Sequence, residues 1–444
     1  MLRCNHDEED EERRHRQQVH NAYQQYATFH QVREQGVNHR RERLISSMRA
    51  VEEGPSIKTI LQKSFSQQQQ KKNNELFCQA TIRNQYFLDN ALKHCGAMTS
   101  QELTQAVRQR NAGSGVEWAT EDQVSKIDSV LKSVYRDWSM EGREERSVVY
   151  DKLLGALENY MPIQNNDRGD RGPPRVAVPG SGVARLAFEI YSKGYSSQGS
   201  DFSLPMLLAS DFILNGCGGE GSSLKQFAIS PFLSETMNVK SVHDRLRTVV
   251  VPDIDVSAVE PINDFKQSPD FTMLAGEFTS LYSHYLPGNR CVGKRQMDSD
   301  EKFDAVVCSF FIDTAPSLPH YLITIWHMLE NGGLFVNMGP LMWHWSRHGC
   351  VIPEDVDSKS TTNGQGDFMS EKHKQRTMHL DQRYLQSVDF TWEEVRDLIV
   401  NCGFELLEEE LDIRTRYTSD MSSMKKVDYD CVFFVARKVV PEIK

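Results

Sequence analysis

Two glycines that follow a short apolar run could let the backbone lie directly against a bound molecule. They are Gly180 and Gly182 in the segment RVAVPGSGVAR, and a helical pattern follows them. Glycine has no Cβ, so the chain can turn tightly at these positions and approach a ligand without a steric clash. Structural turns use the same pair, so the pair alone indicates a ligand loop without establishing one.

The residues around the glycines indicate which class of ligand the loop is suited to bind. A dinucleotide loop has a third glycine where this chain has Arg185, and the glycine–lysine pattern of a phosphate-binding loop is absent. The pattern GxGxA is closer to the loop of methyltransferases that bind S-adenosylmethionine (SAM). The loop therefore favours SAM over a nicotinamide dinucleotide.

Acidic residues are expected to lie at the same edge of the fold as the glycines. Asp201 lies at the end of the next predicted strand, about twenty residues beyond the loop, where an acid hydrogen-bonds ribose hydroxyls. Glu277 and Phe278 follow a third strand and could contact the adenine amine and stack on its ring. The structural alternatives are a helix cap for Asp201 and a core position for Phe278, and the order of the elements favours the ligand role for Asp201.

Alternating strands and helices after residue 165 are expected to position these residues. Strands are predicted in RVAVP, YSSQGSDFS, FDAVVCSFFID, LFVNMGP, FELLEEELDI and YDCVFFVARK. Helices are predicted in VARLAFEIYSKG, which ends at Gly194, in LPMLLASDFIL, in HYLITIWHMLENGG, and in TWEEVRDLIVNCG from Thr391 to Gly403. This alternation is typical of an α/β fold with a parallel sheet.

The first 160 residues follow a helical pattern instead. Asp122 is predicted to begin a helix with one apolar face, and the segment SFSQQQQKKNNELF (64–77) is predicted to be a flexible insertion. Apolar residues of 1–62 recur at helical spacing, namely Val19, Tyr23, Tyr26 and Val32. The expected organisation is a helical region (1–160, low-complexity at 64–74) and a second domain (161–444) with insertions near 286–302 and 347–380.

Composition argues against several classes of protein. The 444 residues include 51 Lys and Arg and 62 Asp and Glu, and the net charge of -11 disfavours sequence-independent nucleic-acid binding. No apolar run approaches the ~20 residues of a membrane helix, and the acidic N-terminus lacks the apolar region of a secretion signal. The nine cysteines form no CxxC pair. We therefore expect reduced thiols, no metal site, and a cytoplasmic protein, with the nucleus as a second location.

Several segments together resemble the carnosine N-methyltransferases of the N2227-like group, over most of residues 120–438. The matching segments are YRDWSMEGREER (135–146), VAVPGSGVARLAFEIYSKGYSSQGSDFS (176–203), VVVPDIDV (249–256), FTMLAGEF (271–278), FFIDTA (310–315), IWHMLENGG (325–333), NMGPLMWH (337–344) and SDMSSMKKVDYDCVFFVARK (419–438). The resemblance implies a class I SAM-dependent methyltransferase domain, which is Rossmann-like, with a helical N-terminal region that covers the cofactor.

The resemblance also implies which residues bind SAM. Arg136 would bind the methionine carboxylate, since a guanidinium can hold a carboxylate in a bidentate fork. A family glutamine falls on Ser133, which cannot make the same reach. The remaining cofactor positions fall on Gly180, Gly182, Asp201, Glu277 and Phe278.

The substrate positions implied by the resemblance are Asp313, His344 and Tyr429, while a second family tyrosine falls on Val427. The implied reaction transfers a methyl group from SAM to an imidazole nitrogen of carnosine or a related histidine-containing dipeptide, giving anserine from carnosine. Asp313 would accept the N–H of one ring nitrogen and leave the other free to attack. His344 and Tyr429 would orient the ring. Taken singly, each residue also has a structural reading, as a helix cap, a surface histidine and a strand-packing residue.

Two other functions stay open at this point. One is a methyltransferase that acts on a peptide or protein histidine, and the other is a SAM-binding scaffold without catalysis. The expected partner is a small molecule rather than a nucleic acid or a membrane, and a homodimer is also open.

Overall fold

The computed structural model describes residues 2–47, 66–97, 118–163, 172–218, 224–263, 265–287, 302–345 and 387–439, together with residues 59, 99 and 101. Almost all of the two predicted insertions lies outside these residues. The helices are α1 (Leu2–Ser47), α3 (Gln67–His94), α5 (Glu121–Trp138), α6 (Arg143–Tyr160), α7 (Arg185–Ser192), α8 (Leu204–Asp211), α9 (Val242–Arg245), α10 (Phe278–Leu281), α11 (Leu318–Met328) and α13 (Trp392–Asn401).

Within the described residues, seven strands form one sheet in the order β5-β2-β1-β6-β7-β9-β8. The strands from β5 to β7 are parallel, and β9 runs antiparallel to both β7 and β8. The strands are β1 (Arg175–Pro179), β2 (Ser196–Asp201), β5 (Phe271–Ala275), β6 (Phe303–Ser309), β7 (Leu329–Gly339), β8 (Phe404–Thr415) and β9 (Tyr429–Lys438), with a separate pair β3 (Phe227–Ile229) and β4 (Val249–Val251). The predicted α/β fold is confirmed.

The strand order reverses between β1 and β6, because the chain leaves β1 toward β2 on one side and later returns to β6 on the other. At such a switch point the loops that follow the two strands separate, and their carboxyl ends border a crevice. The glycine loop after β1 lies at this point. The topology therefore places the predicted cofactor loop where open α/β sheets bind ligands.

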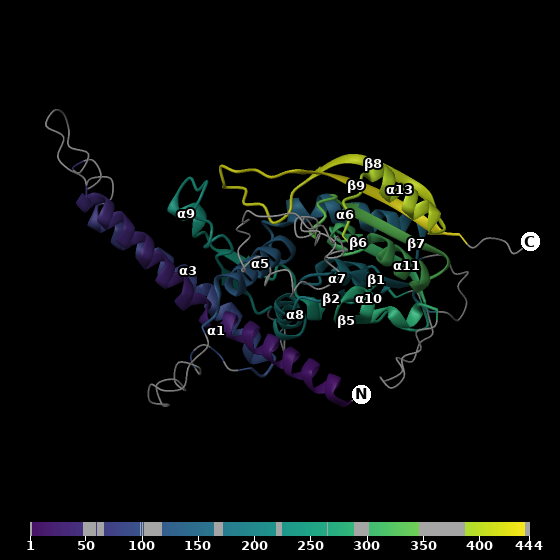
Figure 1. Cartoon of the computed structure of the whole chain (residues 1–444), viewed down its shortest axis with the longest axis horizontal. Coiled ribbons are helices and arrows are strands. Elements are labelled where there is room, and N and C mark those ends of the chain that lie inside the picture. The colour runs from purple at the N-terminus through teal and green to yellow at the C-terminus, as the bar shows by residue number, and fades with distance from the viewer. Residues whose placement is uncertain are drawn as a thin grey trace, which may run out of the picture.

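Helices cover both faces of the sheet (Figure 1). Neighbouring residues of one strand point to opposite faces. Ala177 and Phe335 therefore pack on the same face as the apolar residues of α11 and α13. Val176 and Val336 pack with the apolar residues of α6 and α7 on the other face. Burial on both faces explains why these strands are nearly continuous apolar runs.

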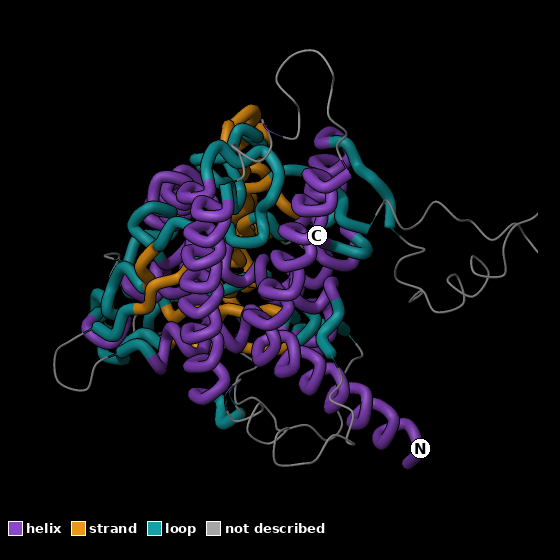
Figure 2. The backbone as a smooth tube through the Cα atoms, turned by 90° about the vertical axis from the view of Figure 1, so that its left-hand side faces the viewer, coloured by secondary structure: helices purple, strands orange, loops and turns teal. Residues whose placement is uncertain are grey.

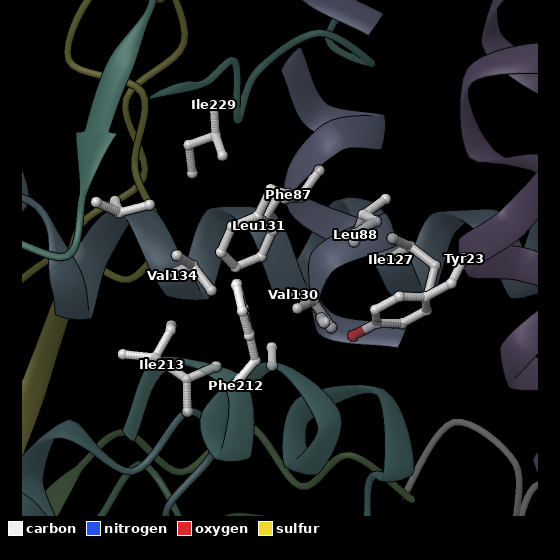
Figure 3. Close-up of a cluster of buried hydrophobic side chains, with 14 of the residues drawn as sticks. Tyr23, Phe87, Leu88, Ile127, Val130, Leu131, Val134, Phe212, Ile213 and Ile229 are labelled. Carbon is white, nitrogen blue, oxygen red and sulfur yellow. The ribbon is translucent and has the colours of Figure 1, made fainter. Parts of the chain in front are cut away.

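The N-terminal helices α1, α3 and α5 form a second core with α8, as expected for a helical region. Tyr23 of α1 is fully buried and its hydroxyl donates to the carbonyl oxygen of Pro205 at 2.7 Å. Figure 3 shows Tyr23 near Leu88, Ile127 and Val130 of this cluster. Figure 2 views the molecule from the side on which α1 and α3 lie, and there the helices stand in front of the strands. In the part of the chain described here, no helix has the length and apolar content to span a membrane.

Two details of the helical region differ from the sequence prediction. The described part of SFSQQQQKKNNELF is not a flexible insertion, because Ser66 accepts a hydrogen bond from Gln69 N and begins α3. Phe77, at the end of that segment, is buried against Leu233 and Leu246, and this packing holds a polar sequence in a helix. Val32 is 61% exposed, so it does not belong to the apolar face of α1.

Two helix ends also lie elsewhere than predicted. Thr120, rather than Asp122, begins α5, and its hydroxyl forms a capping box with Gln123. The helix predicted through residue 333 ends at Met328, because Leu329 already pairs with Phe303 in the sheet. Lys438 binds the freed carbonyl oxygens of Trp326 and Leu329 at 2.8 and 2.7 Å. Helix α6 lies within the predicted helical region (1–160) but packs on the sheet. The predicted domain boundary at residue 160 therefore stays a prediction.

A buried carboxylate joins α6 and α7, the two helices that pack on one face of the sheet. Asp253 accepts from Arg146 of α6 at 2.5 Å through Oδ2, and from Arg185 of α7 at 2.6 Å through Oδ1. All three side chains are at most 6% exposed. Arg185 is the residue that replaces the third glycine of a dinucleotide loop, and this ion pair is its structural role.

We expect Asp253→Ala to lower the free energy of unfolding by about 3–5 kcal/mol, because it removes the carboxylate that the buried Arg146 and Arg185 share and leaves Arg185 with Glu189 alone. Urea unfolding followed by circular dichroism measures this loss. Arg16→Ala is the control, since Arg16 pairs with Glu12 on the exposed surface of α1 and should cost about 0.5 kcal/mol or less. Equal losses in the two variants would contradict a structural role for the Asp253 cluster.

Candidate active site

A cavity of about 910 Å³ lies at the carboxyl ends of the parallel strands. Its walls come from the loops after β1, β2, β5, β6 and β7, from the start of β9, and from α5 of the helical region. The structure brings all nine predicted site residues to this one cavity: Arg136, Gly180, Gly182, Asp201, Glu277, Phe278, Asp313, His344 and Tyr429.

The glycine loop turns with a backbone that other residues rarely adopt. Gly180 has φ of 65° and Gly182 has φ of 55°. A Cβ on Gly180 would lie 2.4 Å from Cδ2 of Phe311, whose ring also lines the cavity. Around Gly182, in contrast, the described structure leaves open space. The first glycine is therefore required by packing, and the second leaves bare backbone at the cavity.

Asp201 fastens this loop to the end of β2. Its Oδ2 accepts from Gly182 N at 2.8 Å, and its Oδ1 accepts from Ser203 N at 2.8 Å. Burial raises the pKa of Asp201, while these N–H groups act in the opposite direction. A carboxylate oxygen has more than one lone pair, so both oxygens can still accept from a ligand hydroxyl. Asp201 thus has a structural role in addition to any ligand role.

Glu277 begins α10 and is held by local hydrogen bonds. Its carboxylate accepts from the backbone N–H and the hydroxyl of both Thr279 and Ser280. Burial alone would raise the pKa of Glu277, but these hydrogen bonds outweigh it and lower the pKa. Phe278 is 4% exposed and packs edge-on against Phe311 and Tyr321, with ring centroids 5.3 and 4.8 Å apart. Phe278 therefore belongs to an aromatic cluster with Phe311 and Tyr321, and this cluster forms part of the cavity wall.

Phe202 is a cavity residue that the sequence prediction missed. It follows Asp201 directly, is 73% exposed and lines the cavity. An exposed aromatic ring beside the acid predicted to bind ribose is suited to stacking on a purine. The sequence does show that Phe202 follows Asp201 directly, which could have indicated a site residue. A phenylalanine in the sequence can equally be buried in the core, however, so its exposure was not predictable.

Arg136 lies on the cavity side of α5, where its guanidinium is already engaged. Its Nε and Nη2 donate to the two carboxylate oxygens of Asp137 at 2.6 and 2.8 Å. The guanidinium lies 4.3 Å from the ring centre of Tyr417. Burial acts to lower the pKa of Arg136, and the Asp137 carboxylate more than offsets it, so the pKa is well above its usual value. The sequence prediction missed both Asp137 and Tyr417.

Asp313 is buried at 2% exposure in the 3₁₀ turn Ile312–Thr314 and holds the segment after β7. Its Oδ2 accepts from Met342 N at 3.0 Å, and its carbonyl oxygen accepts from His344 N at 3.1 Å. Burial raises the pKa of Asp313, and the bond from Met342 opposes this shift. The helix-cap alternative is not observed, because Ser317 is the residue that begins α11.

His344 and Tyr429 reach the cavity from two different segments. His344 is exposed, and Tyr429 begins β9 beside the ring of Phe310, with a centroid distance of 6.2 Å. Burial raises the pKa of the Tyr429 hydroxyl, and the Asp313 carboxylate raises it further. Tyr429 is therefore a neutral phenol near pH 7. Val427, which replaces a second family tyrosine, is 39% exposed and is not among the residues that line the cavity.

Comparisons with known proteins agree with this geometry. Residues 115–440 match the family model described as carnosine N-methyltransferase. A carnosine N-methyltransferase of Schizosaccharomyces pombe is 32% identical over 316 residues, which cover 71% of this chain and 71% of that protein. The mouse carnosine N-methyltransferase is 28% identical over 315 residues, which cover 71% of this chain and 63% of the mouse protein. The chain thus matches less than two thirds of the mouse protein.

Among solved structures, the magnesium protoporphyrin IX methyltransferase of Synechocystis matches 71% of this chain and 94% of its own. It is 9% identical to this chain, with a TM-score of 0.32. The strand order, the glycine loop at the switch point and the family match define a class I SAM-dependent methyltransferase, for which SAM is the methyl donor. Within this class, the chain belongs to the carnosine N-methyltransferase family, as its sequence motifs predicted.

The residues at the cavity fit SAM. The bare backbone at Gly182 leaves space beside the loop, and Arg136 would supply a cation for the methionine carboxylate. Asp201 would supply acceptors for ribose hydroxyls, with the exposed ring of Phe202 beside it.

We expect Gly180→Ala to weaken binding of S-adenosylhomocysteine (SAH), the product of methyl transfer, by about tenfold or more. The added Cβ needs a strained positive φ and displaces Phe311, so the loop and the cavity wall must shift. Isothermal titration calorimetry gives the affinity. Gly155→Ala on α6 is the matched control, because its Cβ would meet no atom within 4 Å. Unchanged affinity for SAH in Gly180→Ala would contradict the assigned place of the loop.

Proposed function

We propose that this protein transfers a methyl group from SAM to an imidazole ring nitrogen of carnosine, or of a related histidine-containing dipeptide, giving anserine from carnosine. The observation that carries the proposal is a buried carboxylate, Asp313, at the same cavity as the glycine loop. The names of the relatives support the substrate class, since the yeast and mouse proteins are both described as carnosine N-methyltransferases.

Asp313 has the properties needed to select the reactive form of an imidazole. A neutral imidazole carries one N–H and one nitrogen with a lone pair. Met342 N donates to Oδ2 of Asp313, the backbone N–H of Asp313 itself also acts on this carboxylate, and no other described residue donates to Oδ1. Oδ1 can therefore accept the N–H of the substrate ring, which leaves the other nitrogen free to attack. The same negative charge stabilises the ring as methylation makes it cationic.

The other cavity residues orient the reactants. Tyr429, as a neutral phenol, can donate to or accept from the ring, and His344 lies on the segment that Asp313 itself fastens. Arg136, Gly180 and Asp201 would hold SAM, which supplies the electrophilic methyl group of its sulfonium when bound. An imidazole is mostly neutral at pH 7, so alignment and exclusion of water, rather than a strong base, are what the protein must provide.

Mass spectrometry of carnosine incubated with the protein and SAM tests this function directly. The expected product carries one added methyl group on the imidazole ring. Labelled SAM with a cell extract forms the second arm of the experiment. Label in protein bands with unmodified carnosine would favour the peptide or protein histidine alternative, and no transfer despite SAH binding would favour the scaffold alternative.

Asp313→Asn should reduce kcat by roughly 10²-fold or more, because the amide cannot supply the negative charge opposite the ring. Binding of SAH should be unchanged, since Asp313 belongs to the part of the cavity assigned to the substrate. Steady-state kinetics and calorimetry measure the two quantities separately. A variant that keeps normal turnover would remove Asp313 from the mechanism.

The pH dependence of kcat/KM should change in the same variant. Burial raises the pKa of Asp313, so its contribution is present above that raised value and is lost as the pH falls through it. The substrate imidazole, with a pKa of about 6.5, is lost as a nucleophile in the same direction. Below both values, log kcat/KM should fall by about two units per pH unit in the wild-type protein and by about one in Asp313→Asn. Equal slopes would show that Asp313 does not titrate in the reaction.

A further inference from the structure

The carboxylate of Asp137 is fully buried beside the cavity and is held by two helices. Asp137 follows Arg136 directly on α5, and neighbouring residues of a helix do not normally face each other. Here, however, Nε and Nη2 of Arg136 bind both oxygens of Asp137 at 2.6 and 2.8 Å. Tyr150 of α6 donates its hydroxyl to Oδ1 of Asp137 at 3.0 Å. Three hydrogen bonds thus compensate the cost of burying this charge.

The contacts of Arg136 restrict its guanidinium on two sides. Its Nε side is bound to Asp137, and its face lies on the ring of Tyr417. A guanidinium has five N–H groups, of which these contacts use one at Nε and one at Nη2. Nη1 donates to no described residue. The end that carries Nη1 and the second Nη2 hydrogen is therefore still able to bind a carboxylate in a fork.

We propose that Asp137, supported by Tyr150, is the positioning residue for Arg136, and that it presents this remaining end of the guanidinium to the methionine carboxylate of SAM. Arg136, Asp137, Tyr150 and Tyr417 all line the cavity. An arginine side chain has many rotamers, and holding one of them in place before the ligand arrives removes an entropic cost from binding. The inference rests on the proposed cofactor role of Arg136.

A pair of ligands separates this role from a general effect on the fold. SAH carries the amino-acid carboxylate, whereas 5′-methylthioadenosine has the same nucleoside and thioether without it. In Asp137→Asn, the affinity for SAH should fall by about tenfold, and that for 5′-methylthioadenosine should stay within about twofold of the wild-type value. Calorimetry with both ligands measures the ratio. Equal changes for the two ligands, or no change for SAH, would overturn the proposal.

Two further variants provide a weaker perturbation of Asp137 and a control. Tyr150→Phe removes one hydrogen bond from Asp137 and leaves the ion pair, so it should lower the affinity for SAH by a smaller factor, about threefold, with the same ligand selectivity. Asp128→Asn is the matched control: Asp128 is buried on the same helix and binds the hydroxyl of Tyr26 at 2.8 Å, away from the cavity. This control should leave the ratio of the two affinities unchanged.

Arg136→Ala distinguishes a failure of this inference from a failure of the proposed cofactor role. If Arg136→Ala leaves the affinity for SAH unchanged, the role of Arg136 itself is wrong. If Arg136→Ala selectively weakens SAH while Asp137→Asn and Tyr150→Phe do not, Arg136 binds the carboxylate without needing Asp137, and only the positioning role fails.

Discussion

The hydrogen bond from Gly182 N to Asp201 joins the ends of two neighbouring parallel strands, and the shape of the cavity follows from it. A second bond, from Ser181 N to the carbonyl oxygen of Ser200 at 3.0 Å, fastens the same loop to β2. With both bonds, the bare backbone of the glycines lies against the space between the strand ends, and Phe311 closes the loop from the β6 side. The parallel arrangement then brings every later loop to the same edge, so Glu277, Asp313 and His344 reach one cavity from separate segments.

The helical region contributes a wall of this cavity rather than a separate body beside it. The indole N–H of Trp138, at the end of α5, donates to the carbonyl oxygen of Val183 in the glycine loop at 2.8 Å. The same helix carries Arg136 and Asp137 to the cavity. On its other side, α5 is tied to α1 by the bond from Tyr26 to Asp128. Helix α5 therefore belongs both to the core of the helical region and to the cavity wall assigned to the methionine end of SAM.

The sequence predicted features that depend on neighbouring residues or on regular alternation. The strand, the glycines and the helix of residues 175–192 follow from local pattern, and so does the sheet that places Asp201 beside the loop. The helical state of the Gln-rich segment was missed because it is stabilised by Phe77 packing on Leu233 and Leu246, which are far away in the sequence. Tyr417 was missed for the same reason, since its contact with Arg136 joins the β8–β9 connection to α5.

Three aspartates at the cavity, Asp137, Asp201 and Asp313, each bind groups of the protein. In the proposed roles, Asp201 and Asp313 also accept hydrogen bonds from a ligand, and Asp137 holds the arginine that binds one. Asp201 holds two backbone N–H groups, Asp313 holds one, and Asp137 holds an arginine and a tyrosine. Asp137 and Asp313 are buried and Asp201 is partly buried, so the charge of each would be costly if it were not bound to the protein. Those same bonds fix its direction before a ligand arrives, which reduces the reorganisation that binding and methyl transfer require. A loss of activity on removing one of them therefore combines a structural and a chemical effect, and the two are separable only by ligands that differ in the single group the residue is thought to serve.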